Sequence, residues 1–549
     1  MSILNLVGDL KYKNRRTEIS IPLSEVREGS NEYANHLVYK KGDKINVYDR
    51  VCNHSGGKLF LESKNKNCAK CPEHGWNIFL QTGMYQNNLK KTSIAYSIRD
   101  SKIVFTQIDP IPYLDAREKE KKIKIEYINH AFLIFHCESF SFAIDPWAIG
   151  SCLSTGWWPE RPRRSDWANI LNECDFVYIS HNHNDHLHQK TLSKVRQDMK
   201  FYVPKFKTDS VKRILSSFGF ENIEYLEFEK VYSLSTDDDF KIISLKSGDH
   251  REDSGIYFRY GVFDFLATID ANFVNFERLP KKVTVFATDI VMGSGEFPLC
   301  FDAISSEEKA KIMKKNLDAG LNLKNKQITA IQPKHYFPYG GFAEAKATRD
   351  QYIKQKIMKH TPKSYEDICA KNGVHLCSIL DKTIYEFVGT KIKRTAFPQT
   401  DFIEVTDEDI ANEISCVKEK YSEIKDDLIL DYFENSTFVD QLSLYVSWAS
   451  DNFTTIYKTV CVDFSRSKPK VSFLTNFDWE KLKSEYDLGS PSNRYLHLKI
   501  RREILNQLIE QSLPWENVSS GYQMRFDRIP NVYNQKFWTH FTNKYVCRL

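Results

Sequence analysis

The stretch that decides the fold is Phe176-Val-Tyr-Ile-Ser-His181-Asn-His183-Asn-Asp185-His186. Its first five residues are mostly aromatic or β-branched and predict a short buried strand. The six residues that follow place three imidazoles and a carboxylate in one loop. These are side chains that hold zinc or ferrous iron in proteins. We therefore predict a metal site on the loop that leaves this strand; the alternative is a loop that merely carries four polar residues.

Predicted strands and helices alternate on both sides of this loop. The strand candidates are short apolar runs, namely residues 123–128, 132–137, 140–144, 241–245, 255–259, 265–269, 283–287 and 328–331. Residues 209–217 and 306–317 lie between them and repeat apolar residues at helical spacing. This alternation predicts an α/β sandwich with its helices outside the sheets.

The chain is long enough for several domains, and its composition changes twice along its length. Residues 35–107 alternate β-rich pieces with Gly, Asn and Lys turns, and a highly charged stretch over 115–122 is typical of a linker. From about residue 400, amphipathic helices mix with strands again. We predict a multidomain α+β protein with an all-β domain over 1–112, an α/β sandwich over 123–400 and a C-terminal α+β domain over 401–549.

Two pairs of Cys and His stand in the N-terminal module, Cys52-Asn-His54 and Cys71-Pro-Glu-His74. Two thiolates and two imidazoles suit a [2Fe-2S] cluster in which Cys holds one iron and His the other, as in a Rieske centre. A structural zinc site is the alternative, since Cys68 forms a Cys-x-x-Cys pair with Cys71. A zinc ribbon would leave both histidines without a role. We therefore favour the Rieske cluster, which supplies electrons one at a time.

Charge and hydropathy limit the partners of the chain. The 549 residues carry 77 Lys and Arg against 72 Asp and Glu, and a net charge of +5 is too dilute for a nucleic-acid or polybasic membrane binder. No apolar run approaches the roughly 18 residues of a membrane-spanning helix, and no secretory signal is evident. We expect a cytoplasmic protein without a nucleic-acid or membrane partner. The absence of a Gly-rich phosphate loop predicts no bound NAD or FAD.

The His-x-His-x-Asp-His loop resembles the signature of the metallo-β-lactamase fold. The resemblance implies an αββα domain in which the first two histidines hold one metal position and the aspartate and last histidine hold an adjacent one. The four residues, which we predict to be catalytic, are His181, His183, Asp185 and His186. The fold implies further ligands from later strand ends, and the sequence offers His250, Asp270 and His335 in chain order. Residues 333–336 resemble the ascorbate-phosphate-lactonase branch of the fold.

The nature of the second metal depends on the first cluster. Zinc would act as a Lewis acid for hydrolysis, and a hydrolase needs no electrons. Imidazole and carboxylate ligands with open positions suit ferrous iron equally well, as in the 2-His-1-carboxylate oxygenases. Because an electron-transfer cluster shares the chain, we predict one or two non-haem iron ions and keep zinc as the alternative.

A Rieske module followed by a metallo-β-lactamase-like domain resembles the CMP-N-acetylneuraminate hydroxylase family. Asp145-Pro-Trp147, Gly156-Trp-Trp158 and Ser165-Asp-Trp167 in the central part, and Trp515-Glu and Gly521-Tyr-Gln near the end, are similar to sequence of that family. The likeness spans essentially the whole chain and is densest from about 124 to 345. The basic stretch over 159–164 and the histidine at position 335 depart from the family.

The resemblance implies a monooxygenase that uses O2 and external electrons to convert the N-acetyl group of CMP-N-acetylneuraminate to N-glycolyl. It also implies an electron donor, such as a ferredoxin or a b-type cytochrome with its reductase, and a homo-oligomer. Three alternatives stay open. The same architecture could oxygenate another amide or amine at carbon or nitrogen, the chain could be a zinc-dependent hydrolase with a redox-sensing Rieske module, or it could be a non-catalytic redox sensor.

A nucleotide sugar is an anion with flat and polar parts, so cationic and aromatic contacts are expected. The residues that we predict to bind substrate are Trp157, Trp158, Arg161, Arg164, Asp289 and Lys334. Each also has a plainer interpretation. The tryptophans could be core residues, the basic side chains could face solvent, and the aspartate could be an ordinary strand-end residue or orient a ligand histidine.

Overall fold

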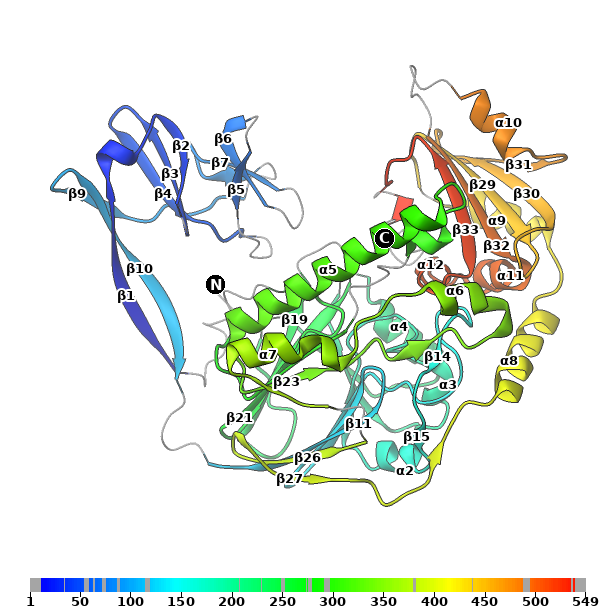
Figure 1. Ribbon diagram of the computed structural model, residues 1–549, viewed down its shortest axis with the longest axis horizontal. Helices are drawn as coiled ribbons and strands as arrows, with labels where there is room; N and C mark the ends of the chain where they lie inside the picture. Colours follow the sequence, from blue (N-terminus) through cyan, green and yellow to red (C-terminus); the bar gives the residue numbers. More distant parts are fainter. Residues whose placement is uncertain are drawn as a thin grey trace.

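The computed structural model describes residues 11–538 with internal gaps. The gaps are residues 34, 54–58, 63–64, 72–75, 86–88, 114–118, 207, 229, 248–251, 273, 275–278, 291–296, 379–381, 437, 487–493 and 535–536. Figure 1 shows a small β module, a large central part and a C-terminal sheet with helices. The predicted multidomain α+β class is confirmed, and the predicted domain boundaries remain predictions. The predicted ligands His54, His74 and His250 lie outside the described residues.

The N-terminal part consists of three small antiparallel sheets. A long ribbon formed by β1 (Lys11–Pro22) and β10 (Lys102–Tyr113), joined by β9 (Tyr96–Arg99), extends away from the module (Figure 1). The second sheet contains β2 (Gly29–Glu32), β3 (His36–Lys41) and β4 (Lys44–Asp49). The third contains β5 (Phe60–Glu62), β6 (Asn65–Lys70), β7 (Asn77–Phe79) and β8 (Met84–Tyr85). Cys52 and Cys71 are fully buried in the core of this part.

The central part is built on two facing sheets. The first has the order β18-β17-β16-β13-β12-β11-β26-β27, and the second has the order β19-β20-β21-β22-β23-β25. The strands of the first sheet are β11 (Lys122–Asn129), β12 (Phe132–Cys137), β13 (Ser141–Ile144), β16 (Phe176–Tyr178), β17 (Lys200–Pro204), β18 (Ile223–Leu226), β26 (Ile384–Val388) and β27 (Lys391–Ala396). Those of the second are β19 (Phe240–Lys246), β20 (Ser254–Tyr260), β21 (Phe263–Ala267), β22 (Val285–Thr288), β23 (His335–Pro338) and β25 (His375–Leu376).

Helices cover the outer faces of both sheets, which confirms the predicted αββα sandwich. One buried cluster joins the first sheet to α2 (Trp167–Asn172), α3 (Gln189–Leu192) and α4 (Ser210–Ser217). Another cluster fills the space between the sheets and includes residues of α5 (Ser306–Ile331) and α7 (Glu366–Asn372), which lie along the second sheet (Figure 1). None of the described helices has the length and apolar character required to span a bilayer.

The predicted strand over 328–331 is wrong. These residues form the last turn of α5, which begins at a Ser305 cap and ends where Gln332 turns left-handed at φ 52°. Ile328 and Ile331 are three residues apart and both fully buried, so the apolar run is one side of a helix that packs on the sheet. A short, mostly apolar stretch such as Ile328-Thr-Ala-Ile331 does not distinguish a strand from a buried helical turn.

The C-terminal part contains a five-stranded sheet with helices against it. Its order is β31 (Lys470–Leu474), β30 (Ile456–Asp463), β29 (Leu442–Ala449), β32 (Arg494–Arg501) and β33 (Met524–Ile529). Its helices are α8 (Asp407–Lys420), α9 (Asp426–Glu434), α10 (Trp479–Ser484), α11 (Arg502–Gln511) and α12 (Glu516–Ser520). Its core also takes in Trp147, Cys152 and Leu299 of the central part. The two parts therefore share one hydrophobic cluster.

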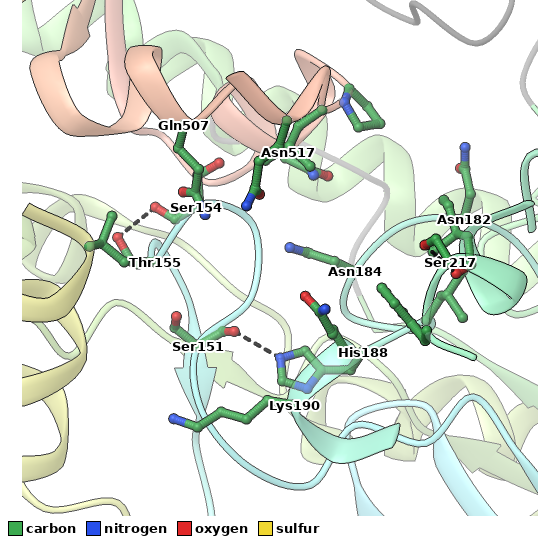
Figure 2. A pocket seen from close by; sticks show the side chains of 18 of the residues that line it. Ser151, Ser154, Thr155, Asn182, Asn184, His188, Lys190, Ser217, Gln507 and Asn517 are labelled. Carbon is green, nitrogen blue, oxygen red and sulfur yellow. Dashed lines mark hydrogen bonds between the residues drawn. The ribbon is translucent and has the colours of Figure 1, made fainter. Parts of the chain in front are cut away.

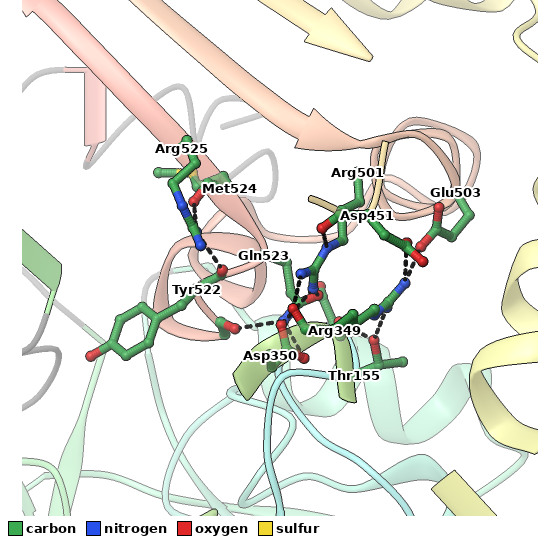
Figure 3. Close-up of polar contacts among 12 residues, drawn as sticks. Thr155, Arg349, Asp350, Asp451, Arg501, Glu503, Tyr522, Gln523, Met524 and Arg525 are labelled. Atoms are coloured by element: carbon green, nitrogen blue, oxygen red, sulfur yellow. Dashed lines mark hydrogen bonds and ion pairs between the residues drawn. The ribbon is translucent and has the colours of Figure 1, made fainter. Parts of the chain in front are cut away.

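Buried ion pairs fix how the C-terminal sheet meets the central part (Figure 3). Arg501 is 1% exposed and donates to Asp350 at 2.6 Å. Arg349 donates to Glu503 at 2.5 Å and to the Thr155 hydroxyl at 2.8 Å. Removing one partner of a buried pair costs ~3–5 kcal/mol, because the other charge is left uncompensated. This network holds the end of β32 and the start of α11 against the segments that carry Thr155 and Asp350.

Candidate metal centre

The carboxyl ends of four strands meet at one edge of the central sandwich. β13 and β16 are parallel neighbours in the first sheet, and β21 and β22 are parallel neighbours in the second. Asp145 directly follows β13, the ligand loop over 181–186 follows β16, Asp270 lies just after β21, and Asp289 directly follows β22. Because parallel strands bring their carboxyl ends to the same edge, residues that are distant in sequence come to one place.

Asp145 anchors two histidines of the loop. Its carboxylate accepts the Ser180 backbone N–H at 2.7 Å, the Ser180 hydroxyl at 2.6 Å and Nδ1–H of His186 at 2.9 Å. Since the Ser180 hydroxyl gives its only proton to Asp145, it accepts a hydrogen bond from Nδ1 of His181, which is 2.8 Å away. Nε2 of both histidines is thereby left with its lone pair available to a metal ion.

The carboxylate of Asp270 lies between these two histidines. One of its oxygens is 3.6 Å from Nε2 of His181, and the other is 3.6 Å from Nε2 of His186. His183 Nδ1 is 2.8 Å from His181 Nε2, and Asp185 Oδ2 is 3.6 Å from His186 Nε2. The ligand atoms thus form two adjacent positions, one beside His181 and His183 and one beside Asp185 and His186, with a carboxylate between them.

A side chain of the C-terminal part also reaches the centre. Oε2 of Glu516, the first residue of α12, is 3.1 Å from Nε2 of His183. A carboxylate there accepts the Nε2–H proton and leaves Nδ1 of His183 as the nitrogen that faces His181. Glu516 therefore orients a ligand from 333 residues away in the sequence.

His130 orients Asp185 and has no free lone pair for a metal. Its Nδ1 accepts the backbone N–H of Gly341 at 3.0 Å, and a backbone amide can only donate. The proton of the His130 ring is therefore on Nε2, which lies 3.2 Å from Oδ2 of Asp185. This contact leaves Oδ1 of Asp185 for another partner.

The backbone around the centre is strained at three places. Asp145, His130 and Ile269 have φ values of 47°, 47° and 54°, in the left-handed region that non-glycine residues seldom adopt. The conformation is least favourable for Ile269, whose side chain is β-branched. Strain of about 1–3 kcal/mol per residue persists only where the surroundings impose it. Here the buried anchors hold the strained residues and aim the carboxylates at the centre.

The residues present fit a metal ion. Asp185 Oδ1 and His186 Nε2 are buried, and neither has a hydrogen-bond partner among the described residues. Such atoms require a compensating contact. The 2.8–3.6 Å separations between ligand atoms match the roughly 2.8–3.6 Å expected for octahedral or tetrahedral ligands bound to one ion at about 2.0–2.2 Å.

The electrostatics favour a cation at the same place. Burial opposes a proton on His183, but Glu516 and the other carboxylates outweigh burial and raise the pKa of His183 to about 9. Burial likewise opposes a proton on His186, yet Asp185, Asp270 and Asp145 raise the pKa of His186 to about 10. A site that draws protons onto its imidazoles is strongly negative, and a divalent cation would neutralise it more completely.

His335 is a predicted ligand that the structure does not bring to this centre. It is the first residue of β23, which runs parallel to β22, so it lies at the opposite, amino edge of the second sheet. Its neighbours are His375 and Cys377 instead. Burial, with His375 second, lowers the pKa of His335 to about 4. The prediction that His335 is a ligand of the iron site is therefore wrong.

The predicted substrate residues do not form one group. Arg164 is held by Glu126 and Asp166, and Lys334 Nζ donates to the Thr390 hydroxyl at the amino edge. Asp289 lies at the carboxyl edge but is buried and pairs with Lys324 at 2.5 Å, which is a structural contact.

Trp157, Trp158 and Arg161 lie near one another in the fold. Both tryptophans are buried, so they are chiefly core residues. Trp157 and Arg161 line a hollow of about 370 Å³ together with Lys354 and Lys359. Two carboxylates line the same hollow, since Glu160 lies 3.6 Å from Arg161 and Glu344 pairs with Lys354 at 2.9 Å. The role of Arg161 as an anion contact therefore stays a prediction.

A larger pocket of about 430 Å³ lies beside the ligand loop. Asn182 and Asn184, which alternate with the ligands, line it from the central part, and Gln507 and Asn517 face them from the C-terminal helices (Figure 2). Asn517 is 5% exposed, and its Oδ1 has no hydrogen-bond partner within the described part of the chain. The pocket therefore offers amide donors and acceptors to a ligand that carries hydroxyl and amide groups.

Residues 20–96 match the family model described as "Rieske [2Fe-2S] domain". The chain thus contains a Rieske-type domain, which precedes a two-sheet sandwich with a histidine and carboxylate centre. Cys52 and Cys71 lie inside the matched region and are buried, and the four cluster ligands remain a residue-level prediction.

Similarity to curated proteins extends over nearly the whole chain and confirms the predicted resemblance. The chain is 25% identical to the cytidine monophosphate-N-acetylneuraminic acid hydroxylase of Mus musculus, over 95% of this chain and 94% of that protein. It is 26% identical to the protein of the same name from Pongo pygmaeus, over 96% and 95%. For the Danio rerio protein the identity is 24%, over 92% and 88%.

Solved structures match about half of the chain at low similarity. CmlA, a diiron β-hydroxylase from Streptomyces venezuelae, is 15% identical with a TM-score of 0.32, and the match covers 50% of this chain and 55% of that one. The metallo-β-lactamase fold protein YhfI from Bacillus subtilis is 10% identical with a TM-score of 0.29, over 49% and 100%.

Three side chains of the centre were not predicted as site residues, namely Asp145, His130 and Glu516. Asp145 had a usable signal, because an acidic residue directly after a predicted strand lies at the edge where ligands gather. His130 lies in a turn between two predicted strands, which is a weaker signal. Glu516 stands in the family-like Trp515-Glu stretch, but neither local pattern nor spacing connects α12 with a loop in another part of the chain.

Proposed function

We propose that the chain is a Rieske-dependent monooxygenase that hydroxylates the N-acetyl methyl of CMP-N-acetylneuraminate, with O2 as the oxygen source and external electrons. The observation that carries the proposal is the joint presence of a Rieske domain and a buried histidine and carboxylate centre in one chain. The names of the curated relatives supply the substrate. Oxygenation of another amide or amine would use the same centre.

Non-haem iron suits the centre better than zinc, because only a metal that changes oxidation state can use the electrons of a Rieske cluster. An iron ion held there would supply reductive O2 chemistry, which an acid, a base or a serine nucleophile cannot supply at an unactivated methyl group. Its ligands would be His181 and His183 on one side and Asp185 and His186 on the other, with Asp270 between them. His250 stays a proposed ligand.

The protein residues hold the centre rigid and dry. His181 is fully buried and His186 is 1% exposed, so water has little access from their side. Asp145 and Ser180 fix the tautomers of both histidines, and Glu516 fixes that of His183. Fixed ligands need no reorganisation during turnover, which lowers the barrier of a reaction that depends on positioning.

The substrate would bind between the central and C-terminal parts. The amide-lined pocket beside the ligand loop suits the hydroxyl and amide groups of a sugar, and Arg161 in the smaller hollow is the proposed phosphate contact. Binding between two parts of the chain would explain why the C-terminal part is fixed to the central part by buried ion pairs.

An electron donor outside the chain is part of the proposal, because a Rieske cluster stores a single electron. A ferredoxin, or a b-type cytochrome with its reductase, has the required chemistry. We also propose a homo-oligomer in which the Rieske domain of one subunit serves the centre of the next. In Figure 1 the β1 and β10 ribbon holds the Rieske module away from the central part of its own chain.

Metal analysis of protein purified without air tests the function. We expect iron at both centres, a Rieske electron paramagnetic resonance signal, and incorporation of ¹⁸O from ¹⁸O2 into the N-glycolyl product. His183→Ala should abolish hydroxylation and keep the Rieske signal. His360→Gln is the matched control, because His360 is also buried but lies outside the centre. Within the described part of the chain its ring hydrogen-bonds the backbone carbonyl of Leu317. Zinc in the second centre with turnover in the absence of reductant would instead identify a hydrolase.

A further inference from the structure

A second group of metal-binding side chains lies at the amino edge of the central sandwich. It consists of His335 on β23, His375 on β25, and Cys377, which directly extends β25. His335 and His375 are register partners in parallel strands, and the backbone N–H of Cys377 bonds the Tyr336 carbonyl. Since side chains alternate along a strand, His375 and Cys377 point to the same face, where His335 also lies.

The distances within this group match those of ligands around one tetrahedral ion. Nδ1 of His335 and Nδ1 of His375 are 3.3 Å apart, and Cys377 Sγ is 3.4 Å from Nδ1 of His375. A zinc ion with bonds of about 2.05 Å to nitrogen and 2.3 Å to sulfur would separate two nitrogens by about 3.3 Å and a nitrogen from the sulfur by about 3.5 Å. All three ligand atoms lie within 4.8 Å of one another.

His335 is oriented for ligation. Its Nε2 lies 3.4 Å from the backbone carbonyl of Thr390, which can only accept a hydrogen bond. The ring proton is then on Nε2, and the lone pair of Nδ1 points at His375 and Cys377. Donation of the outer N–H to a carbonyl is the usual arrangement around a histidine that binds a metal. Phe387 of the other sheet packs against the same ring, with centroids 5.3 Å apart.

The group is separate from the centre described above. That centre lies where β13, β16, β21 and β22 end, whereas His335 begins β23, which is parallel to β22. The ligand types also differ, because the carboxyl edge offers imidazoles and carboxylates and the amino edge offers imidazoles and a thiol. Thiolate favours zinc over magnesium, calcium or manganese.

We propose that His335, His375 and Cys377 bind one Zn²⁺ ion, with water in the fourth position, and that this ion clips the edge strand β25 to β23. Binding forms two Zn–N bonds and one Zn–S bond, and the thiol of Cys377 releases its proton to solvent. No oxidation or reduction takes place. Because the proposal concerns the amino edge alone, it stands or falls independently of the hydroxylase activity.

Zinc and cobalt binding to the full-length protein tests the site. Wild-type protein should take up one more equivalent of Zn²⁺ than Cys377→Ser. With Co²⁺ as the probe, wild type should show a thiolate-to-cobalt charge-transfer band that Cys377→Ser lacks. Cys369→Ser is the matched control, because Cys369 is also a buried thiol of this region but lies on α7. It should retain the band and the extra equivalent.

His375→Gln supplies a second test that does not depend on a buried substitution, since His375 is exposed. Loss of a ligand should weaken zinc binding at this site by more than about tenfold, because changes in the groups around a ligand alone cost 10–100-fold. The melting temperature of wild type should rise with added Zn²⁺, and that of His375→Gln should not. Equal zinc content and equal affinity in wild type, Cys377→Ser and His375→Gln would overturn the proposal.

Discussion

The two edges of the central sandwich carry histidine groups of different construction. At the carboxyl edge His181 and His186 are at most 1% exposed, and Asp145 and Ser180 fix the outer nitrogen of both rings. At the amino edge His375 is exposed, and a backbone carbonyl fixes the outer nitrogen of His335. The first group is assembled from loops of several strands, and the second from two paired strands.

The difference shows two ways in which a sheet makes a metal site. Where strands end, each loop can aim its side chains freely, and a network of anchors must then hold them in place. Within paired strands, the register itself sets the spacing of the side chains, and few anchors are needed. We therefore expect the carboxyl edge to depend strongly on residues that never touch the metal.

The largest effect is expected from Asp145→Asn. An amide replaces a carboxylate that accepts three hydrogen bonds, so the Nδ1 protons of His181 and His186 lose their fixed positions. We expect the affinity of the centre for metal to fall by more than about 100-fold, and hydroxylation to be lost. Metal content, hydroxylation and the Rieske signal are the measurements, and the Rieske signal should persist.

Asp175→Asn is the control for this substitution, because Asp175 also accepts a backbone N–H, from Ser141 at 2.8 Å, but at the other end of β13. It should bind metal and turn over normally. Full metal content in Asp145→Asn would show that the anchors at the carboxyl edge are dispensable, and the contrast between the two edges would fail.

Glu516→Ala should have a smaller effect, a decrease of about 10–100-fold in metal affinity and in hydroxylation, because His183 alone loses its anchor. Glu516→Gln should restore part of the loss, since its amide oxygen can still accept Nε2–H of His183. Glu510→Ala, which removes a surface ion pair with Lys425 in the same part of the chain, is the control. Equal kinetics for Glu516→Ala and Glu510→Ala would refute a positioning role for Glu516.

His497 is a buried histidine that can be compared with His183 and His186. Its ring bonds the Ser447 hydroxyl at 2.9 Å, whereas theirs bond carboxylates. Burial lowers the pKa of His497 to about 3 from its ordinary 6.5. The unfolded chain therefore binds a proton that the folded chain refuses between pH 6.5 and 3, and stability falls as the pH drops through this range.

From pH 6.5 to pH 5.0 this single group should cost about 1.6 kcal/mol of unfolding free energy. Urea unfolding of wild type and His497→Gln at the two pH values measures it as the difference between the two proteins. The variant should lose less stability on acidification by that amount. Parallel pH dependence of the two proteins would show that His497 is protonated without penalty in the fold.

The smallest effect is expected at the predicted anion contacts. Arg161→Gln should raise KM for the proposed nucleotide-sugar substrate about three- to tenfold and leave kcat nearly unchanged, because the hollow that it lines is open to solvent and the lost interaction is screened. Lys334→Gln should leave KM unchanged, since Lys334 lies at the amino edge and bonds Thr390. A raised KM in Lys334→Gln would indicate that substrate binds at the amino edge, and it would contradict the proposed binding site.

That the four residues of the ligand loop lie close to Asp270 could be predicted, because chemistry and position agree in the sequence. Each follows a strongly apolar strand, and the sheet brings such strand ends together whatever the rest of the chain does. The two Cys and His pairs in the Rieske-type domain were proposed on their local spacing, and they remain predicted ligands.

His335 could not be assigned correctly, because its place depends on the type of the preceding element. A strand over 328–331 would have put His335 at a strand end, with the other ligands. In the structure those residues close α5, and His335 begins β23, so the same histidine lies at the opposite edge. One wrong prediction of a short element therefore placed His335 at the opposite edge of the sheet.

By itself the sequence determined the inventory of this protein: the Cys and His pairs, the loop of imidazoles and carboxylate, the alternation of strands and helices, and hence the class of chemistry. Only the tertiary structure decided which nitrogen of each ring faces the centre, that a carboxylate of α12 completes it, and which histidines belong elsewhere. The physical reason is the distance along the chain over which each interaction acts. Strand and loop propensities act between neighbours in the chain, whereas a hydrogen bond that fixes a tautomer joins whatever atoms the packing of the sheets places within 3 Å.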